Sequence, residues 1–340
     1  MRAAPVVRPS GPDWIRLPSV PDPEGFAAPF AGVTGGALLL AGGANFPGPR
    51  PWEGGTKVWY DSIYVLPPGA AAWQAAGRLP APCAYGLSVP LPDGVACIGG
   101  GDARTHTARV QVLSWDGRAL RRREGPPLPG PCAFMTGARV GSRIYVLGGI
   151  DRPDATTARP DFWAWDFTRP GGGWSALPPL PGPARILALA GAAGEGLLVA
   201  SGASLHAGAG KAERTYLADA YVYDPARGWR RVADLPRPAV AAPTPLPVTA
   251  DGRLLVVGGD DGTRRHLDGP GHPGFPSDIL AYDPVADCWS PAGEAPVSRA
   301  TAPTAEWQGR WVVLNGERRP GERSPEVWAG AVGLKAEGGA

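Results

Sequence analysis

Short aliphatic runs that end in two small residues recur along the chain at nearly even spacing. There are six of them: LLLAGG, VACIGG, IYVLGG, LLVASG, LLVVGG and WVVLNG. Their closing pairs begin at Gly42, Gly99, Gly148, Ser201, Gly258 and Asn315, which are 57, 49, 53, 57 and 57 residues apart. A repeat of this period is typical of proteins built from copies of one structural unit, so we expect six units.

Each unit continues with the same order of elements. A polar, glycine-rich connection leads to an aromatic and aliphatic segment such as SIYVL or DAYVYDP, followed in most units by a segment that begins with tryptophan, such as WQAAGRLP. Alternating hydrophobic and polar positions between glycine and proline predict short β-strands. Four strands per unit form a propeller blade, and the diglycine, Tyr-Asp and Trp markers resemble the kelch repeat. The predicted fold is all-β, a six-bladed kelch-type β-propeller.

The two ends of the chain are predicted to close the ring together. The sixth unit lacks a tryptophan strand, whereas the segment WIRLP at Trp14 is a tryptophan strand with no unit in front of it. Pairing the two removes a free sheet edge, so residues 14–18 should complete blade six. We expect a single propeller over residues 14–333, with tails at 1–13 and 334–340.

Composition and charge narrow the protein class. The 340 residues include 50 Gly and 42 Pro, which disfavours long helices. The net charge of +2 gives no overall field that attracts nucleic acid or an anionic membrane. The four cysteines, Cys83, Cys97, Cys132 and Cys288, form no CxxC motif and are expected as thiols. Without a signal-like or membrane-spanning apolar run, we expect a cytoplasmic monomer with no cofactor, metal, nucleic acid or membrane partner.

The connections that follow the diglycine strands should meet on one face, beside the central channel, and they form the predicted site. They hold all four histidines: His106, His206, His266 and His272. The first connection also contains Trp52 and Trp59, flat rings that can line a sugar site. Glu53 lies between Trp52 and two glycines, where partial burial would raise the pKa of its carboxyl group toward general-base use.

Two loops carry a resemblance to a known family. The segments AGGANFP and WEGG in the first connection, with the Tyr-Asp strand after them, resemble the cyclically permuted mutarotase family of kelch proteins, and within it the sialic acid mutarotases. The last connection matches the same family at Asn315, Gly316, Glu317, Pro320, Gly321 and Arg323. One position departs, because Cys83 stands before Ala-Tyr-Gly where the sialic acid enzyme carries an arginine.

The resemblance implies an isomerase that interconverts the anomers of a free sugar, N-acetylneuraminate, by acid–base ring opening. The family's catalytic glutamate falls on Glu53. We expect Arg323, with Arg104 as second choice, to pair with the sugar carboxylate. Hydroxyl groups would bind Asn45 and Glu317. Lys57 would stabilise developing oxyanion charge or neutralise Glu53.

Two other classes of protein are weighed against this hypothesis. A kelch module that binds a protein or a glycan would use the same loops, because a fold does not specify a function. A copper enzyme similar to galactose oxidase would need histidine ligands, and no loop contains a histidine pair at metal-ligand spacing. The Glu53 loop favours the enzyme over the binding module, since a module has no need for a carboxylate held beside Trp52.

Overall fold

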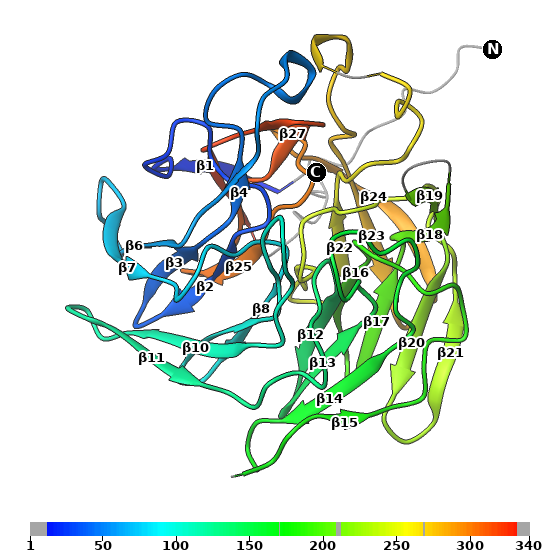
Figure 1. Cartoon of the computed structure of the whole chain (residues 1–340). Helices are drawn as coiled ribbons and strands as arrows, with labels where there is room; N and C mark the ends of the chain where they lie inside the picture. The colour runs from blue at the N-terminus through cyan, green and yellow to red at the C-terminus, as the bar shows by residue number, and fades with distance from the viewer. Residues whose placement is uncertain (1–11, 170, 209–211, 268, 332–340) are drawn as a thin grey trace, which may run out of the picture.

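The described residues form six β-sheets of three or four strands, which are arranged around a central channel as Figure 1 shows. The computed structural model describes residues 12–169, 171–208, 212–267 and 269–331. The six-bladed propeller is therefore confirmed. Most of the expected N-terminal tail and all of the C-terminal tail lie outside the described residues. No helix among the described residues is long and apolar enough to cross a membrane.

Each blade is an antiparallel sheet in which each successive strand lies farther from the channel. Blade one consists of β2 (Phe30–Thr34), β3 (Ala37–Ala41), β6 (Ser62–Leu66) and β7 (Gln74–Arg78). Blade two consists of β8 (Leu87–Leu91), β9 (Gly94–Ile98), β10 (Val110–Trp115) and β11 (Leu120–Glu124). Blade three consists of β12 (Thr136–Val140), β13 (Arg143–Leu147), β14 (Phe162–Asp166) and β15 (Ser175–Ala176).

The second half of the ring repeats this order with one exception. Blade four consists of β16 (Leu189–Ala193), β17 (Gly196–Ala200), β20 (Ala220–Asp224) and β21 (Gly228–Val232). Blade five has β22 (Leu254–Val257), β23 (Asp278–Asp283) and β24 (Cys288–Glu294). Its innermost segment pairs with β22 through the isolated bridge between Val248 and Leu254, and no longer ladder forms because Pro245 and Pro247 have no N–H to donate.

Blade six joins the two ends of the chain. It consists of β25 (Thr304–Trp307), β26 (Arg310–Leu314), β29 (Val327–Ala331) and the N-terminal β1 (Trp14–Leu17). Strand β1 pairs antiparallel with β29, with Trp14 opposite Gly330. The Trp14 ring meets Trp311 edge-on, with centroids 4.6 Å apart. The predicted closure is confirmed.

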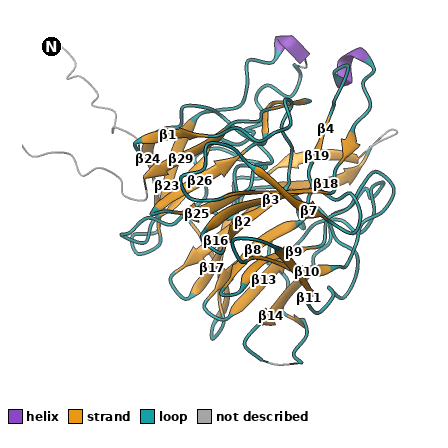
Figure 2. Cartoon of the chain, turned by 90° about the vertical axis from the view of Figure 1, so that its left-hand side faces the viewer, coloured by secondary structure: helices purple, strands orange, loops and turns teal. Residues whose placement is uncertain are grey.

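In the described residues, three small hairpins and two short helices lie on one face of the propeller. The hairpins are β4 (Ala44–Asn45) with β5 (Val58–Trp59), β18 (Ala203–Ala207) with β19 (Ala212–Tyr216), and β27 (Glu317–Arg319) with β28 (Glu322–Arg323). The 3-10 helices are η1 (Pro51–Glu53) and η2 (Gly269–Gly271). Figure 2 shows both helices at the same end of the molecule.

The repeated sequence markers have structural roles. Residues 37–41 are buried on both faces because neighbouring blades pack against each side of an inner strand, which explains why the aliphatic runs do not alternate. The tryptophans at the start of the outer strands link each of these strands to a segment about 50 residues earlier in the chain. Trp73, Trp174, Trp229 and Trp289 donate from Nε1 to backbone carbonyls 2.8–2.9 Å away. All four cysteines are free thiols, as expected.

A closed circle of backbone hydrogen bonds links the blades at the channel. Six equivalent residues have a left-handed backbone, with φ between 47° and 61°: Ala28, Tyr85, Phe134, Leu187, Ala241 and Thr301. Each donates its N–H to the carbonyl of the equivalent residue in the preceding blade at 2.7–3.0 Å, and Ala28 completes the circle by donating to Thr301. The left-handed conformation costs a non-glycine residue about 1 kcal/mol or more, which these bonds help to offset.

Candidate functional site

The first and last loops lie side by side on the hairpin-bearing face (Figure 1). A Cβ atom added to Gly321 would lie 2.6 Å from Pro51 and 3.1 Å from the Trp52 ring. The two loops are therefore packed in direct contact at the seam between blade six and blade one. This is the arrangement that the sequence predicted, and it brings the two loops of the family resemblance together.

Arg323 is the most unusual charged residue of this seam. Its side chain is 3% exposed, and Nη2 pairs with Glu317 Oε1 at 2.7 Å across the β27–β28 hairpin. The guanidinium lies over the Phe46 ring at 4.7 Å. Its Nε and Nη1 groups are buried, and no described residue gives them a hydrogen-bond partner. Unpaired buried donors are costly, so the side chain is poised to bind an acceptor, best of all an anion.

Glu317 lies beside this guanidinium in a basic hairpin. Its side chain is 16% exposed, so it is largely withdrawn from solvent. The neighbouring Arg319 pairs with Glu322 at 2.7 Å, and Arg318 pairs with the same carboxylate. The hairpin thus holds three arginines against two glutamates. A carboxylate and a partly unsatisfied guanidinium are held together in a setting that favours a bound anion.

Glu53 is exposed to solvent at the end of η1. Its Oε2 accepts a hydrogen bond from the backbone N–H of Arg50 at 2.8 Å, so the carboxylate caps its own turn. The expected partial burial of Glu53 is therefore wrong. Trp52 is half-buried and packs against Gly269 and Gly321, which makes it a contact between the loops of blades one, five and six.

Asn45 is completely buried beneath the first loop. Its Nδ2 donates to Asp22 at 3.0 Å and to the Gly25 carbonyl at 2.9 Å, while its Oδ1 accepts from the Tyr60 hydroxyl at 2.8 Å. Both amide hydrogens are thus used by the protein. In this structure Asn45 anchors the loop and offers no free donor to a sugar.

Lys57 and Trp59 lie at the other edge of the first loop. The Lys57 Nζ donates to the Tyr85 hydroxyl and lies 4.5 Å from the centroid of the Tyr85 ring and 5.2 Å from that of Trp59. No ion pair joins Lys57 to Glu53 in the described part of the chain, so neutralisation of Glu53 finds no support in the contacts. The Trp59 Nε1–H is buried, and none of the described residues provides an acceptor for it.

One face of the β4–β5 hairpin connects the surroundings of Arg323 with those of Lys57. Ala44 pairs with Trp59 and Asn45 with Val58, so Phe46 and Lys57 follow at the next opposed positions. Side chains alternate between the two faces of a strand, which puts Phe46, Lys57 and Trp59 on the same face. The face runs from Arg323 over Phe46 to the Lys57–Tyr85 contact.

Arg104 lies in the exposed loop of blade two. Its backbone N–H donates to Asp102 at 2.8 Å, and its guanidinium is in solvent. His106 in the same loop is more constrained, because its Nδ1 contacts the Ile150 carbonyl at 3.1 Å and therefore carries the proton. Burial lowers the pKa of His106 below its ordinary value of 6.5. In the neutral imidazole, Nε2 is therefore the nitrogen without a proton.

Cys83 occupies a position that has an internal structural role in other blades. Its thiol donates to the Gly99 carbonyl at 3.5 Å. At the equivalent position of blade four, Arg185 is 1% exposed, donates to the Ser201 carbonyl at 2.9 Å and pairs with Asp219 at 2.7 Å. The departure at Cys83 therefore replaces a side chain that braces a blade.

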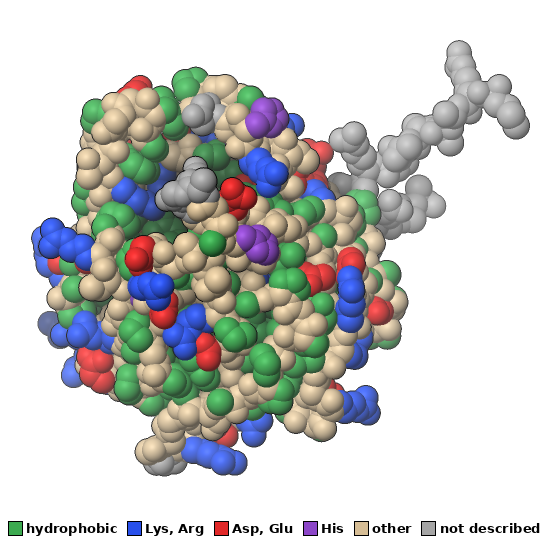
Figure 3. All heavy atoms as spheres, turned by 45° about the vertical axis from the view of Figure 1, so that its right-hand side comes forward, with side chains coloured by type: hydrophobic (Ala, Val, Ile, Leu, Met, Phe, Trp, Pro, Cys, Tyr) green, Lys and Arg blue, Asp and Glu red, His purple; other side chains and the backbone are tan. Residues whose placement is uncertain are grey.

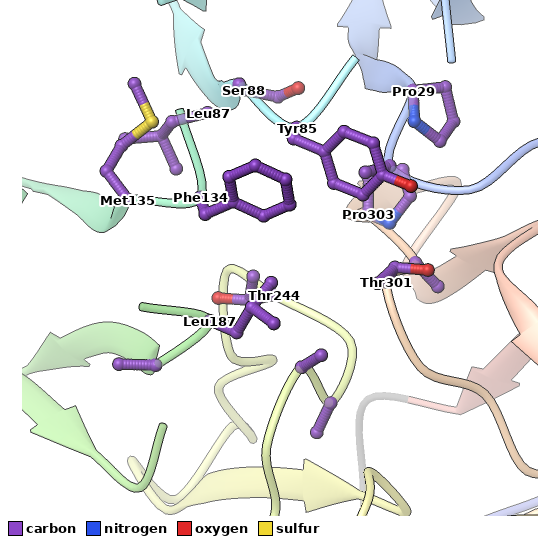
Figure 4. Close-up of a pocket in the computed structure, with 16 residues that line it drawn as sticks. Pro29, Tyr85, Leu87, Ser88, Phe134, Met135, Leu187, Thr244, Thr301 and Pro303 are labelled. Carbon is purple, nitrogen blue, oxygen red and sulfur yellow. The ribbon is translucent and has the colours of Figure 1, made fainter. Parts of the chain in front are cut away.

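The cavities in the channel and at its rim differ in volume and in the residues that line them. Inside the ring of left-handed residues the free volume is about 60 Å³, too small for a sugar, and the side chains of Tyr85, Phe134 and Leu187 point into it (Figure 4). A cavity of about 540 Å³ at the other end of the channel is lined largely by small apolar residues. On the hairpin face a third cavity of about 230 Å³ adjoins Lys57 and Trp59. Figure 3 shows a hollow with hydrophobic side chains inside it and basic ones at its edge.

Tyr85 and Phe134 are the site residues that the sequence pattern did not single out. They stand two positions after Cys83 and Cys132, where they look like core aromatics at the start of inner strands. The left-handed backbone instead turns both toward the channel mouth, with their rings stacked 4.4 Å apart. The signal available in the sequence was the repeated Cys-Ala-aromatic triplet.

Comparison with known proteins identifies relatives for part of the chain. A family model described as N-acetylneuraminate epimerase matches residues 7–121. Proteins named N-acetylneuraminate epimerase from Yersinia pestis (strain Pestoides F) and Brucella suis are 38% and 36% identical over 121 and 131 residues. These matches cover 32% and 34% of this chain and 30% and 33% of the relatives. The match to the family model includes the first loop and ends before the last one.

A solved structure extends the likeness to the whole fold. The protein described as "Structure of YjhT" superposes with a TM-score of 0.67 over 92% of this chain and 96% of its own, at 15% sequence identity. At that identity the likeness concerns the fold. The resemblance expected from the sequence is thus confirmed: the first third of this propeller is similar to the N-acetylneuraminate epimerases.

Proposed function

We propose that this protein is a sugar mutarotase that interconverts the anomers of free N-acetylneuraminate at the seam between the first and last loops. The observation that carries the proposal is Arg323, a buried guanidinium beside the Glu317 carboxylate whose Nε and Nη1 have no partner among the described residues. The similarity of residues 7–121 to N-acetylneuraminate epimerases supports the choice of this sugar.

The carboxylate of the sugar would bind Arg323. A carboxylate presents two oxygens that match the forked donors of a guanidinium, and burial strengthens such a contact. Phe46 fixes the plane of the guanidinium from one side. Lys57 adds a second positive charge on the same face of the first loop. Together these residues orient the carboxyl end of the sugar toward blade six.

The chemistry requires one proton to be moved between two oxygens on the same carbon. A base takes the proton from the anomeric hydroxyl, the C2–O6 bond breaks as a carbonyl forms at C2, and O6 receives a proton. Rotation about the C2–C3 bond then presents the other carbonyl face, and the reverse steps close the ring. One carboxyl group can serve both oxygens in turn, so a single glutamate suffices as acid and base.

The geometry favours Glu317 over Glu53 for this role. The anomeric carbon is bonded to the carboxyl carbon, so the base must lie within a few ångströms of the group that binds the carboxylate. Glu317 is 2.7 Å from Arg323 and largely shielded, whereas Glu53 is exposed and capped by Arg50. Glu53 remains the candidate that the family resemblance suggests, and replacement of each residue separately distinguishes the two.

Exchange spectroscopy by proton NMR tests the proposal. The α-to-β exchange rate of N-acetylneuraminate is measured with and without micromolar protein, near the pH at which spontaneous exchange is slowest. We expect clear acceleration, and far less with galactose, which has no carboxylate for Arg323 to bind. An unchanged rate for N-acetylneuraminate would contradict the proposal and favour a kelch binding module.

A further inference from the structure

The cavity beside Lys57 and Trp59 is a feature that the proposed acid–base chemistry leaves unused. It has a volume of about 230 Å³ and lies where the loops of blades one, two and three meet. This is several times the volume of about 30 Å³ that a water molecule occupies in the liquid. The cavity is therefore large enough to hold a substituent of a sugar.

The walls of this cavity are mostly apolar. Tyr85 and Phe134 form a stacked pair on one side, and Ala84 and Ala133 lie at its base. His106 also lines the cavity, and its Nδ1 is bonded to the Ile150 carbonyl, which leaves Nε2 as a hydrogen-bond acceptor when the imidazole is neutral. Trp59 forms part of the wall, and its Nε1–H is buried with no acceptor among the described residues. Such a lining suits a small group that combines a methyl with a carbonyl and an N–H, and it disfavours a chain of hydroxyls.

We propose that this cavity binds the acetamido group of N-acetylneuraminate and makes the enzyme selective for N-acylated sugars. The inference rests on the proposed function, because it takes the sugar carboxylate to be bound at Arg323. In the pyranose ring the acetamido carbon, C5, lies directly across from C2, which bears the carboxylate. The Phe46, Lys57 and Trp59 face leads from Arg323 to the cavity, so the two ends of the sugar would meet two different subsites.

The selectivity has a defined origin. The acetyl methyl would contact the Tyr85 and Phe134 rings, and its carbonyl would accept from the Trp59 Nε1–H. A methyl group in an apolar pocket and one matched hydrogen bond together change kcat/KM by about 10-fold or more. The analogue with a hydroxyl in place of the acetamido group, 3-deoxy-D-glycero-D-galacto-non-2-ulosonic acid, lacks both contacts. Its carboxylate and anomeric centre are unchanged, so it reports on the pocket alone.

The test compares the exchange rates of these two sugars with the wild-type protein and with three variants. Ala103→Phe adds bulk from an exposed loop residue at the rim of the cavity, where folding is not at risk. Trp59→Phe keeps a ring and removes the donor. Thr156→Phe is the matched control, because it adds the same bulk to an exposed residue of the neighbouring loop that does not line the cavity.

The wild-type protein and Thr156→Phe should prefer the N-acetyl sugar at least 10-fold. Ala103→Phe and Trp59→Phe should each reduce that preference several-fold, because they act on the contacts that only the acetamido group makes. If the wild-type protein accelerates both sugars equally, the acyl pocket is refuted while the proposed function stands.

Saturation-transfer NMR supplies a readout that does not depend on catalysis. If neither sugar exchanges faster with the protein, the proposed function fails, and saturation transfer to the acetyl methyl of bound N-acetylneuraminate then decides the pocket separately. The strongest signal should appear at that methyl. A signal weaker than that of the ring protons, or the absence of any signal, refutes the pocket.

Discussion

The hairpins of blades four and six occupy the same place in their blades and differ in what they carry. Each begins directly after the closing pair of small residues, and each opens with one cross-strand pair. In blade four the pair is Ala203 with Tyr216, and in blade six it is Glu317 with Arg323. The two hairpins thus share a backbone arrangement. The first cross-strand pair is a packing pair in blade four and an ion pair in blade six.

The two hairpins also differ in how completely their polar groups are satisfied. The Tyr216 hydroxyl donates to Asp260 at 2.6 Å, and burial together with this hydrogen bond raises the pKa of the phenol. In the part of the chain that the structure describes, Arg323 has a partner for Nη2 but none for Nε or Nη1. A satisfied buried group stabilises a fold, whereas an unsatisfied one is a cost that binding can repay. This difference in hydrogen bonding indicates that the hairpin of blade four is structural and that the hairpin of blade six belongs to the candidate binding site.

The largest expected effect comes from removing the strand that holds both hairpins in one closed ring. A chain that begins at residue 19 loses the pairing of β1 with β29, the Trp14–Trp311 contact and the Pro18 carbonyl that accepts from Trp73. We expect a strongly lowered, cooperative melting transition by circular dichroism. A chain that begins at residue 12 keeps all three features and should melt like the full chain. Equal melting of the two truncated chains would contradict the closure.

The next largest effect should separate the hairpins by activity. Arg323→Lys keeps the charge and loses the forked pair of donors, so kcat/KM for N-acetylneuraminate should fall by about 100-fold. Tyr216→Phe should leave kcat/KM within twofold of the wild-type value, because Tyr216 contacts Asp260 and not the proposed substrate site. The comparison fails if both variants lose activity equally in the NMR exchange assay.

Tyr216→Phe, which should keep its activity, should instead lose stability. Tyr216→Phe leaves the Asp260 carboxylate without its hydroxyl partner, which should lower the free energy of unfolding by about 1 kcal/mol. In a chain of this length that corresponds to roughly 1–2 °C in Tm. Differential scanning calorimetry measures the change. An unaltered Tm would mean that the Tyr216–Asp260 hydrogen bond does not stabilise blade four.

The smallest effect concerns blade two, where Gly101 and His106 form the equivalent pair. Because burial lowers the pKa of His106 in the folded state, folding favours the neutral imidazole. The resulting stability is present above the unfolded pKa of about 6.5 and is lost as the pH falls through the lower folded pKa. His106→Gln should therefore show a smaller loss of Tm between pH 7.5 and pH 5 than the wild type. His272, whose pKa burial also lowers, accounts for part of the remaining loss.

The scaffold could be predicted from the sequence because it repeats. The aliphatic runs mark inner strands buried on both faces, and the unpaired WIRLP segment required a partner in blade six. The contact between the first and last loops followed from the closed ring. These features depend on local patterns and on topology, both of which a single sequence carries.

The site could be predicted only in part, because loop conformation depends on contacts between distant segments. The burial expected for Glu53 was wrong because η1 turns its carboxylate back onto the Arg50 backbone. Trp52 packs on Gly269 of another blade, a contact that no local pattern announces. Tyr85 was missed because its left-handed backbone, set by the hydrogen-bonded circle, directs a ring that looked like core toward the channel mouth.

The most direct test of the account replaces the two candidate bases one at a time. The α-to-β exchange rate of N-acetylneuraminate is measured by NMR with the wild-type protein, Glu317→Gln and Glu53→Gln, each checked for an unchanged circular dichroism spectrum. We predict that Glu317→Gln loses at least 100-fold of the acceleration and that Glu53→Gln keeps it within threefold. Full acceleration by Glu317→Gln together with loss in Glu53→Gln would move the chemistry to the exposed turn and contradict the account.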